Sequence, residues 1–280
     1  MLLHHTFIEQ AKKNPQKVAI FDQMTGAETK FDKLLIASLL LANKIKSYKG
    51  RYIGIMLPPS AGCIIATLAT LFAGKTPVMI NYSTGATQNC IYAQKKCNFN
   101  TILTSEKLLE KIQEDPVKGM VFLEDILKSI NIIEKAKAAM LSKLPTSIIK
   151  TLVSGGTIED ELVILFTSGS EKDPKAVILT HKNIQANIDS IMKILTVSSN
   201  DVFIANLPYF HVFGLTINLW MPLFLGSKIV AHANPLDYKT IVQSIKKHRV
   251  SILVATPTFY YWYLKRSTQG DFDSIRYAIA

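Results

Sequence analysis

The sequence predicts an α/β protein with layered, mostly parallel sheets flanked by helices. Short apolar segments alternate along the chain with longer segments of helical periodicity. Two long stretches lack Asp, Glu, Lys and Arg, namely Tyr52–Gly74 and Val202–Ser227. Prolines interrupt both stretches, and strands of parallel sheets are apolar throughout because both of their faces are buried. We therefore interpret them as buried elements of a soluble protein rather than membrane spans.

The first third of the chain predicts strands and helices in regular alternation. Asp32 is the expected cap of the first long helix, and Ser60 of the second. We expect strands at Val18–Phe21, Thr29–Phe31, Tyr52–Leu57, Thr76–Ile80 and Thr101–Leu103, and helices at Lys33–Ser47, Ala61–Ala73 and about Gln88–Lys96. This order is typical of a doubly wound sheet.

The middle of the chain differs in composition. Between Ile126 and Lys150 there are five lysines and one glutamate. One helical face is expected to carry Ile126, Ile130, Ile133, Met140 and Leu144, with Pro145 ending the helix. Two interpretations stay open: the segment packs on the domain, which we favour, or it touches an anionic membrane.

The last third returns to alternating elements. We expect strands at Val163–Phe166, Ala176–Leu179, Val202–Leu207, Lys228–Val230, Ser251–Ala255 and Ile275–Ala280, and a helix at Tyr238–His248. The chain is thus divided into a first α/β region (1–106), a lysine-rich helical connection (107–158) and a second α/β region (159–280).

Charge and cysteine content narrow the class of protein. The net charge is +11, but the lysines are spread along the chain and no nucleic-acid-binding motif is present. We therefore expect a solvated basic surface and no nucleic-acid partner. The three cysteines, Cys63, Cys90 and Cys97, have no zinc-type spacing, and the start of the chain is not a signal peptide. A reduced cytoplasmic protein without a metal site is expected, peripheral to the inner membrane face if the middle segment binds lipid.

The segment from Thr167 to Lys175 carries the strongest chemical signal. Three hydroxyls, a glycine and a lysine lie between two apolar strands. Backbone N–H groups, hydroxyls and an ammonium on one turn suit a polyphosphate. An ordinary polar hairpin loop would have a similar composition, and no G-x-x-x-x-G-K-[ST] motif is present.

The order of these residues resembles the phosphate-binding loop of the adenylate-forming enzymes, the acyl-CoA synthetase and luciferase superfamily. That loop reads roughly T-S-G-[ST]-[TE]-G-x-P-K-G-V, and Lys172 and Ala176 depart from its glycines. The resemblance assigns the ATP phosphates to Thr167, Ser168, Gly169, Ser170, Glu171 and Lys175. Thr180-His181-Lys182-Asn183 also fits the family, where T-H-x-N opens the next helix, and Thr180 is a plausible N-cap.

Two later segments resemble the family's acyl site. Pro208–Gly214 resembles L-P-x-F-H-x-x-G, beside the carboxylate substrate, and Ala255–Phe259 resembles the segment bordering the acyl tunnel. The implied pocket residues are Phe210, His211, Gly214, Thr256 and Pro257. Together with Asn234–Asp237, they look most similar to bacterial synthetases that activate long-chain acids for acyl carrier protein or coenzyme A. Some of those are fused to, or paired with, a lysophospholipid acyltransferase.

The resemblance implies that a fatty acid and Mg-ATP give acyl-AMP, whose acyl group passes to a thiol of coenzyme A or acyl carrier protein. No catalytic side chain is assigned, because positioning and charge neutralisation carry such chemistry. The chain is expected to be an N-terminal fragment, inactive by itself, without the C-terminal part of the large domain and the small lid domain. Two alternatives are a catalytically incompetent binding or interaction module, and an adenylating enzyme for aryl or amino acids.

Overall fold

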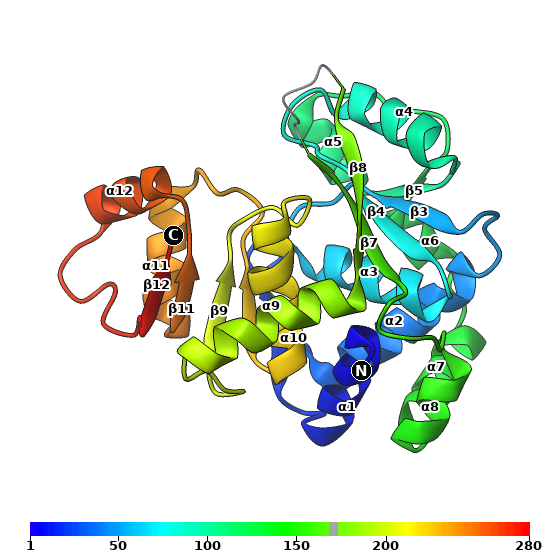
Figure 1. Ribbon diagram of the computed structural model, residues 1–280, viewed down its shortest axis with the longest axis horizontal. Coiled ribbons are helices and arrows are strands. Elements are labelled where there is room, and N and C mark those ends of the chain that lie inside the picture. Colours follow the sequence, from blue (N-terminus) through cyan, green and yellow to red (C-terminus); the bar gives the residue numbers. More distant parts are fainter. Residues whose placement is uncertain (168–172) are drawn as a thin grey trace.

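A computed structural model, which describes residues 1–167 and 173–280, contains two six-stranded sheets (Figure 1). Sheet A has the order β12-β11-β9-β10-β1-β2, and only β2 is antiparallel to its neighbour. Its strands are β1 (Val18–Asp22), β2 (Ala27–Lys30), β9 (Val202–Ala205), β10 (Lys228–Ala231), β11 (Ile252–Val254) and β12 (Tyr277–Ile279).

Sheet B repeats this plan with the order β6-β5-β3-β4-β7-β8, and only β8 is antiparallel. Its strands are β3 (Tyr52–Ile55), β4 (Thr76–Met79), β5 (Ile102–Thr104), β6 (Met120–Phe122), β7 (Glu161–Thr167) and β8 (Lys175–Thr180). The expected mostly parallel α/β layers are therefore present. The two sheets draw strands from both sides of the expected boundaries at 106 and 158, a division that stays a prediction.

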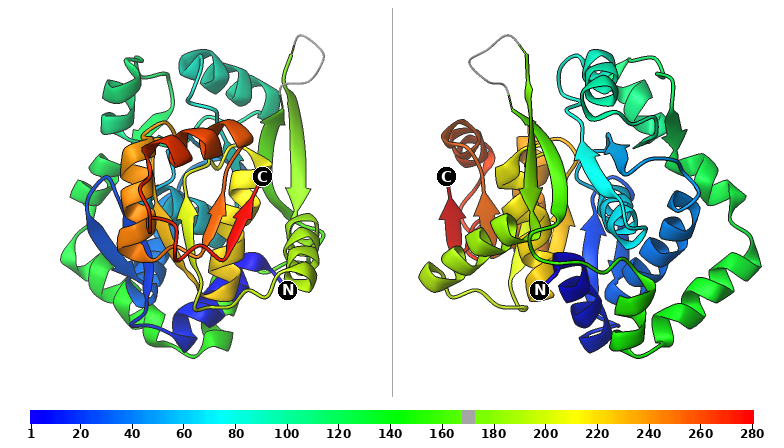
Figure 2. Two further views of the ribbon diagram at one scale, coloured as in Figure 1. Left: turned by 90° about the vertical axis from the view of Figure 1, so that its left-hand side faces the viewer. Right: turned by 45° about the vertical axis from the view of Figure 1, so that its right-hand side comes forward.

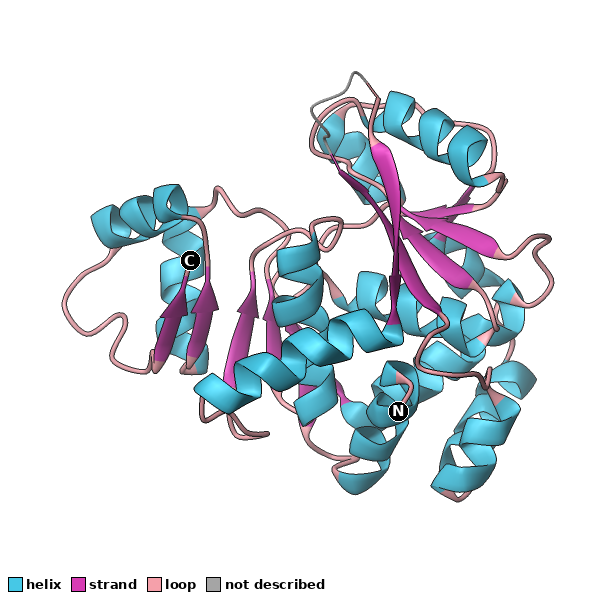
Figure 3. Cartoon of the chain, viewed as in Figure 1, coloured by secondary structure: helices cyan, strands magenta, loops and turns pink. Residues whose placement is uncertain are grey.

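Helices fill the space between the sheets and cover their outer faces (Figures 1 and 3). The inner helices are α1 (Leu3–Lys13), α2 (Phe31–Ile45), α3 (Ala61–Phe72), the π-helix η1 (Gly214–Trp220) and α10 (Met221–Leu225). Helix α3 contacts β1 of sheet A as well as β3 and β4 of sheet B. Helices α4 (Ala86–Cys97) and α5 (Glu106–Ile112) cover sheet B, and α11 (Tyr238–His248) and α12 (Pro257–Arg266) cover sheet A.

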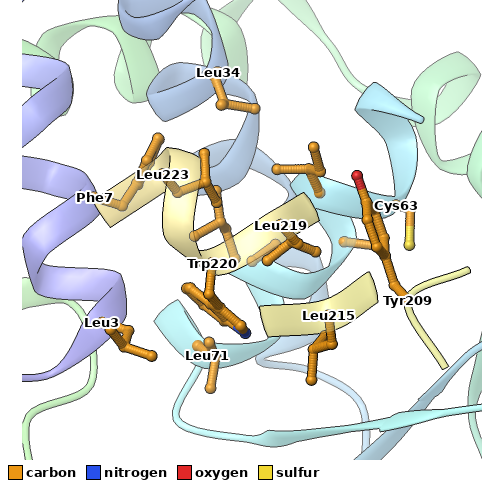
Figure 4. Close-up of a cluster of buried hydrophobic side chains, with 14 of the residues drawn as sticks. Leu3, Phe7, Leu34, Cys63, Leu71, Tyr209, Leu215, Leu219, Trp220 and Leu223 are labelled. Atoms are coloured by element: carbon orange, nitrogen blue, oxygen red, sulfur yellow. The ribbon is translucent and has the colours of Figure 1, made fainter. Parts of the chain in front are cut away.

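The central core lies where the inner helices meet (Figure 4). Trp220 is 1% exposed and packs among side chains of α1, α3 and η1. Burying aromatic and aliphatic side chains of this size supplies most of the stabilisation of such a layer. The long apolar stretches of the sequence are thus explained by burial. Among the described residues, no helix is both long and apolar enough to cross a membrane.

The start of α2 corrects one prediction. The helix begins at Phe31, which is fully buried, and Asp32 lies in its first turn instead of capping it. Its first amides are satisfied from a distant turn: Phe31 N donates to Lys17 O at 3.0 Å, and Asp32 N to Pro15 O at 3.0 Å. A side-chain cap is unnecessary because these carbonyls take its place.

The lysine-rich connection also differs from its prediction. Two helices replace the single expected one, α6 (Leu123–Ser129) and α7 (Ile132–Lys143), and a third, α8 (Thr146–Leu152), follows Pro145, before which the helix ends as predicted. Asn131 and Glu134 form a capping box that starts α7, which ends the helical register of α6. The expected common face is therefore divided, with Ile126 buried while Ile133 and Met140 are 61% and 70% exposed.

Candidate functional site

A cleft of about 640 Å³ lies where the carboxyl ends of strands from both sheets approach each other. Asp22 and Ala233–Leu236 reach it from β1 and β10 of sheet A, and Leu57, Tyr82 and Ser105 from β3, β4 and β5 of sheet B. Ligands of open α/β sheets bind beyond the carboxyl ends of the strands. The topology alone therefore marks this edge as the candidate site.

Asp22 ties the two sheets together at the wall of the cleft. Its Oδ2 accepts from Ala61 N at 2.9 Å, at the start of α3, and its Oδ1 accepts from Met24 N at 3.0 Å. Ser60 Oγ accepts from Cys63 N at 3.1 Å, which confirms the predicted cap. The buried carboxylate is thus fully engaged in structure, since it satisfies amides that would otherwise be orphaned.

The predicted Pro208–Gly214 segment lies next to this cleft. Tyr82, which lines the cleft, meets the edge of Phe210 at 5.1 Å between ring centroids, with the rings almost perpendicular. Phe210 is buried, and the neighbouring His211 is exposed with its ring centroid 4.5 Å away. Partial desolvation lowers the pKa of His211, so its imidazole is neutral at pH 7. A flat apolar wall and a neutral polar ring therefore stand together.

Gly214 has a steric reason to be glycine. A Cβ at this position would lie 2.4 Å from Pro208 O and 2.9 Å from Leu207 O. The chain folds back tightly here, with His211 N donating to Pro208 O at 3.2 Å, and continues into η1. π-helical turns are rare and are frequent at functional sites. The motif glycine therefore allows Phe210 and His211 to be presented on a closely packed turn.

Thr256 and Pro257 reach the same edge of sheet A by a different route. They follow β11, the neighbour of β9, and start α12, where both are exposed. A buried amide network joins the two segments: Asn206 Nδ2 donates to Tyr263 Oη at 2.8 Å, and Asn218 Nδ2 donates to Asn206 Oδ1 at 3.3 Å. This network brings α12 and η1 together across the end of β9. Neither Thr256 nor Pro257 lines the large cleft.

The predicted phosphate loop is the connection between β7 and β8. Its described ends are Thr167 and Lys175, which are exposed and pair with each other in the ladder. Tyr92 of α4 donates its hydroxyl to Pro174 O at 2.8 Å and meets the ring of Phe166. Ser168, Gly169, Ser170 and Glu171 lie outside the described residues. The base of the loop is thus held from both sides, with a hydroxyl opposite an ammonium.

The T-H-x-N segment has a structural explanation. Asn183 N donates to Thr180 Oγ1 at 3.2 Å, and Thr180 N donates to Asn183 Oδ1 at 2.9 Å, a reciprocal cap that opens α9 (His181–Ile194). His181 is buried and its Nδ1 accepts from Leu3 N at 3.1 Å. The predicted N-cap is confirmed. The motif fixes how the chain leaves sheet B after the phosphate loop.

Several site residues were not predicted from the sequence. Tyr82 and Asp22 line the cleft, and Lys107 and Lys111 of α5 line it from the side of sheet B. Tyr82 and Asp22 each lie just beyond a predicted strand, and this position at the sheet edge is the signal that could have found them. The lysines had no such signal, because α5 was not predicted.

Comparisons with known proteins agree with this geometry. Residues 7–280 match the model of the AMP-binding enzyme family. The chain is 24% identical over 261 residues to 4-coumarate–CoA ligase 1 of Petroselinum crispum, covering 89% of this chain and 46% of that protein. It is 27% identical over 195 residues to the long-chain-fatty-acid–CoA ligase ACSBG2 of Xenopus laevis, covering 65% and 26%. The chain thus spans about half, or less, of the length of these relatives.

Solved structures show the same fold. O-succinylbenzoate coenzyme A synthetase (MenE) from Bacillus subtilis, in complex with AMP, superposes with a TM-score of 0.79 at 20% identity, over 98% of this chain and 66% of that one. The same enzyme in complex with ATP and magnesium ion gives a TM-score of 0.77. Together, the two-sheet architecture, the edge cleft and the family match show that this chain belongs to the AMP-binding enzyme family.

Proposed function

We propose that the protein to which this chain belongs activates a long-chain fatty acid with Mg-ATP and passes the acyl group to a thiol. In the first step a carboxylate oxygen attacks the α-phosphorus of ATP. The bond from this phosphorus to the oxygen that bridges to the β-phosphate breaks, and pyrophosphate leaves. In the second step the sulfur of coenzyme A or acyl carrier protein attacks the acyl carbon, and AMP leaves. The observation that carries the proposal is the β7–β8 hairpin at the carboxyl edge of sheet B.

The hairpin supports the nucleotide part of the proposal. Thr167 and Lys175 are exposed and adjacent across the ladder, so a hydroxyl donor and an ammonium can meet the same phosphate group. Ser168 and Ser170 with their hydroxyls, and Gly169 and Glu171 with their backbone N–H groups, complete the proposed grip on the β- and γ-phosphates. Bound Mg²⁺ would supply further neutralisation of the phosphate charge. Holding pyrophosphate in a fixed position stabilises it as a leaving group.

The Phe210 segment supports the carboxylate part. A neutral imidazole at His211 can donate to a carboxylate oxygen without the cost of burying a second charge. Phe210 and Tyr82 would border the chain of the acid, and Thr256 and Pro257 would border it from α12. Aliphatic side chains form part of the cleft wall, among them Leu57, Leu108, Ile112 and Leu236, which favours an aliphatic acid.

Lys107 and Lys111 support an acceptor that carries phosphate. Both line the cleft, together with Glu114 and Glu124, and their ammonium groups could hold the phosphate of a pantetheine arm that approaches from α5 while its thiol points toward Phe210. Coenzyme A and acyl carrier protein share this arm. The resemblance to bacterial synthetases that serve acyl carrier protein, and the cytoplasmic location expected from the cysteines, belong to this proposal. Cys63, Cys90 and Cys97 are all free thiols.

ATP–pyrophosphate exchange on the longest version of this reading frame tests the proposal. Palmitate should support exchange well above an aryl acid, an amino acid or no acid. Exchange with the aryl or amino acid alone would keep the adenylating chemistry and replace the substrate class. A folded protein that binds ATP in calorimetry but exchanges with no carboxylate would overturn the proposal in favour of a binding module.

A further inference from the structure

Helix α7 turns its largest apolar side chains toward solvent. Ile132, Ile133 and Met140 are 81%, 61% and 70% exposed, whereas Ala138 on the opposite side is buried. At 100° per residue, Ile132, Ile133, Ala136 and Met140 fall within one outward stripe, here called the α7 stripe. A stripe on the inward side would need no further explanation. An outward one on a surface helix indicates a contact that the folded chain does not itself supply.

Polar anchors on the inward side fix this orientation. Lys44 of α2 pairs with Glu134 at 2.7 Å, and Lys12 of α1 donates to Ser142 O at 2.9 Å. The capping box of Asn131 and Glu134 defines the first turn. Rotating α7 to bury the stripe would break the Lys44–Glu134 pair and the bond from Lys12 to Ser142 O, so the exposure of Ile132 and Met140 is part of the fold.

The charges around the stripe are of one sign. Glu134 is the only acid of α7, and Lys44 already neutralises it. Lys135, Lys137 and Lys143 are exposed, and no ion pair joins any of them to an acid within the described part of the chain. On the helical wheel, Lys137 borders the stripe on one side, Lys135 on the other, and Lys143 its C-terminal end. An apolar stripe bordered by lysines is the pattern of a helix that lies in a membrane interface.

We propose that α7 lies on an anionic phospholipid surface, with Ile132, Ile133 and Met140 at the level of the headgroups and the three lysines on lipid phosphates. Charge complementarity selects this occupant. A second copy docking by the same stripe would bring these lysines against one another, which is unfavourable. Figures 1 and 2 show α7 and α8 at an edge of the molecule away from α11 and α12, where a flat surface can reach them.

Helix α8 also carries exposed apolar side chains. Ile148 and Leu152 of α8 lie four residues apart on one side and are 43% and 49% exposed. Leu141 of α7 and Leu152 of α8 line a groove of about 140 Å³ together with residues of α2 such as Leu39. Leu141 lies away from the stripe on the helical wheel, and none of the stripe residues lines this groove.

Vesicle flotation at low ionic strength tests the proposal with this chain. Protein should float with phosphatidylcholine vesicles that contain phosphatidylglycerol and stay in solution with phosphatidylcholine alone or at high salt. Replacing Lys135, Lys137 and Lys143 with Gln should lower the partition coefficient by on the order of 100-fold. In the matched control, Gln replaces Lys95, Lys96 and Lys118, which are exposed on the outer side of sheet B. Both triple variants lose three positive charges and therefore have the same net charge.

The apolar contribution has its own matched pair. Ile132→Gln with Met140→Gln should weaken flotation, whereas Ile194→Gln with Leu264→Gln, at 82% and 64% exposure, should not. An equal loss of vesicle binding in the two lysine triple variants would mean that net charge alone causes the binding, and would overturn the assignment to α7. Absence of binding by the unchanged protein would overturn it too. Sedimentation without vesicles covers the remaining occupant: a dimer lost in Ile132→Gln/Met140→Gln would make the stripe a protein interface and overturn the lipid proposal.

Discussion

Sheets A and B have the same plan and end in different hairpins. Each has five strands in parallel order and one antiparallel edge strand, β2 in sheet A and β8 in sheet B. In sheet A the turn is short: Asp22 pairs with Ala27, Gly26 N donates to Asp22 O at 2.8 Å, and Gly26 has φ of 69°. In sheet B, Thr167 pairs with Lys175 across a longer connection.

The difference teaches where the chemistry of this fold comes from. At the end of β1 the carboxylate of Asp22 is used up by two backbone amides. At the end of β7 the hydroxyl of Thr167 is exposed and opposes an ammonium. The sheet supplies the edge in both places, and we expect the longer β7–β8 connection, with three hydroxyls and a lysine in its sequence, to be the one that binds phosphate. The proposed function therefore resides in loop residues and not in the shared scaffold.

The largest expected effect separates the two edge strands. Lys175→Ala should reduce fatty-acid-dependent exchange by about 10²–10³-fold, because a preorganised cation at the leaving group is lost. The exposed side chain contributes little to packing, so the thermal midpoint should hardly change. Lys30→Ala is the matched change on β2, with an exposed lysine that contacts Gln16, and it should leave exchange intact. Equal losses of exchange in the two variants would contradict the proposed difference between the two hairpins.

Acid should act strongly where the chain leaves sheet B. His4 and His181 are both buried, with 5.2 Å between their ring centroids. Burial lowers the pKa of His4 to about 3 and that of His181 to about 4. The unfolded chain binds these protons near pH 6.5 and the folded chain does not, so stability falls as pH drops below 6.5. From pH 7 to 5 the loss is on the order of 2 kcal/mol for each imidazole.

His4→Leu tests this acid sensitivity. Urea unfolding at both pH values should show the pH-dependent loss reduced by one imidazole's share. A loss as large as in the original chain would mean that the buried pair does not set the acid response. His211→Asn should reduce the loss by less than His4→Leu, because that ring is exposed and only partly desolvated.

Two glycines distinguish a site turn from a structural turn. Gly214→Ala should cost about 1–3 kcal/mol, because the new Cβ meets backbone oxygens that must move. The shift should also reach Phe210 and lower exchange. Gly26→Ala should cost about 1–2 kcal/mol, because an L side chain is strained at this positive φ. No steric clash adds to this cost, since nothing lies within 4 Å of the added Cβ. Exchange should be unchanged in that variant, and a loss there would contradict the separation of roles.

The smallest effect concerns the buried network of sheet A. Tyr263→Phe removes the acceptor of Asn206 Nδ2 and should cost about 1–2 kcal/mol, measured by urea unfolding. In sheet B, Thr104→Val removes the hydrogen bond that Thr104 Oγ1 donates to Met56 O at 3.0 Å, and should cost no more. A much larger loss for Thr104→Val would reverse the expected ranking.

Local signals in the sequence predicted much of this structure. Ser60 and Thr180 were identifiable as caps because the groups that they satisfy lie within three residues. Asp32 was wrongly predicted because carbonyls of Pro15 and Lys17, distant in sequence from the helix interior, satisfy the first amides of α2. The break before α7 was missed because the apolar spacing continues through Asn131.

Long-range relations could not be predicted. β1 pairs with β10 some two hundred residues away, and no local pattern specifies that partner. Tyr82 meets Phe210 because the carboxyl ends of the two sheets approach each other, and Asn206 meets Tyr263 because β9 and β11 are neighbours; both are long-range relations as well. The phosphate-binding role of the β7–β8 connection is a prediction from residue order alone, which was possible because its residues are contiguous. Ser168, Gly169, Ser170 and Glu171 lie outside the described residues, and their roles stay predictions.

Replacing the β7–β8 connection with the β1–β2 turn tests the central claim most directly. In the longest version of this reading frame, residues 168–174 would be replaced with Gln-Met-Thr-Gly, the sequence of residues 23–26 that joins β1 to β2. The measurement is palmitate-dependent ATP–pyrophosphate exchange, with circular dichroism to confirm folding. We predict a folded protein with no palmitate-dependent exchange. Exchange that persists at the original rate would contradict the claim that this hairpin carries the chemistry.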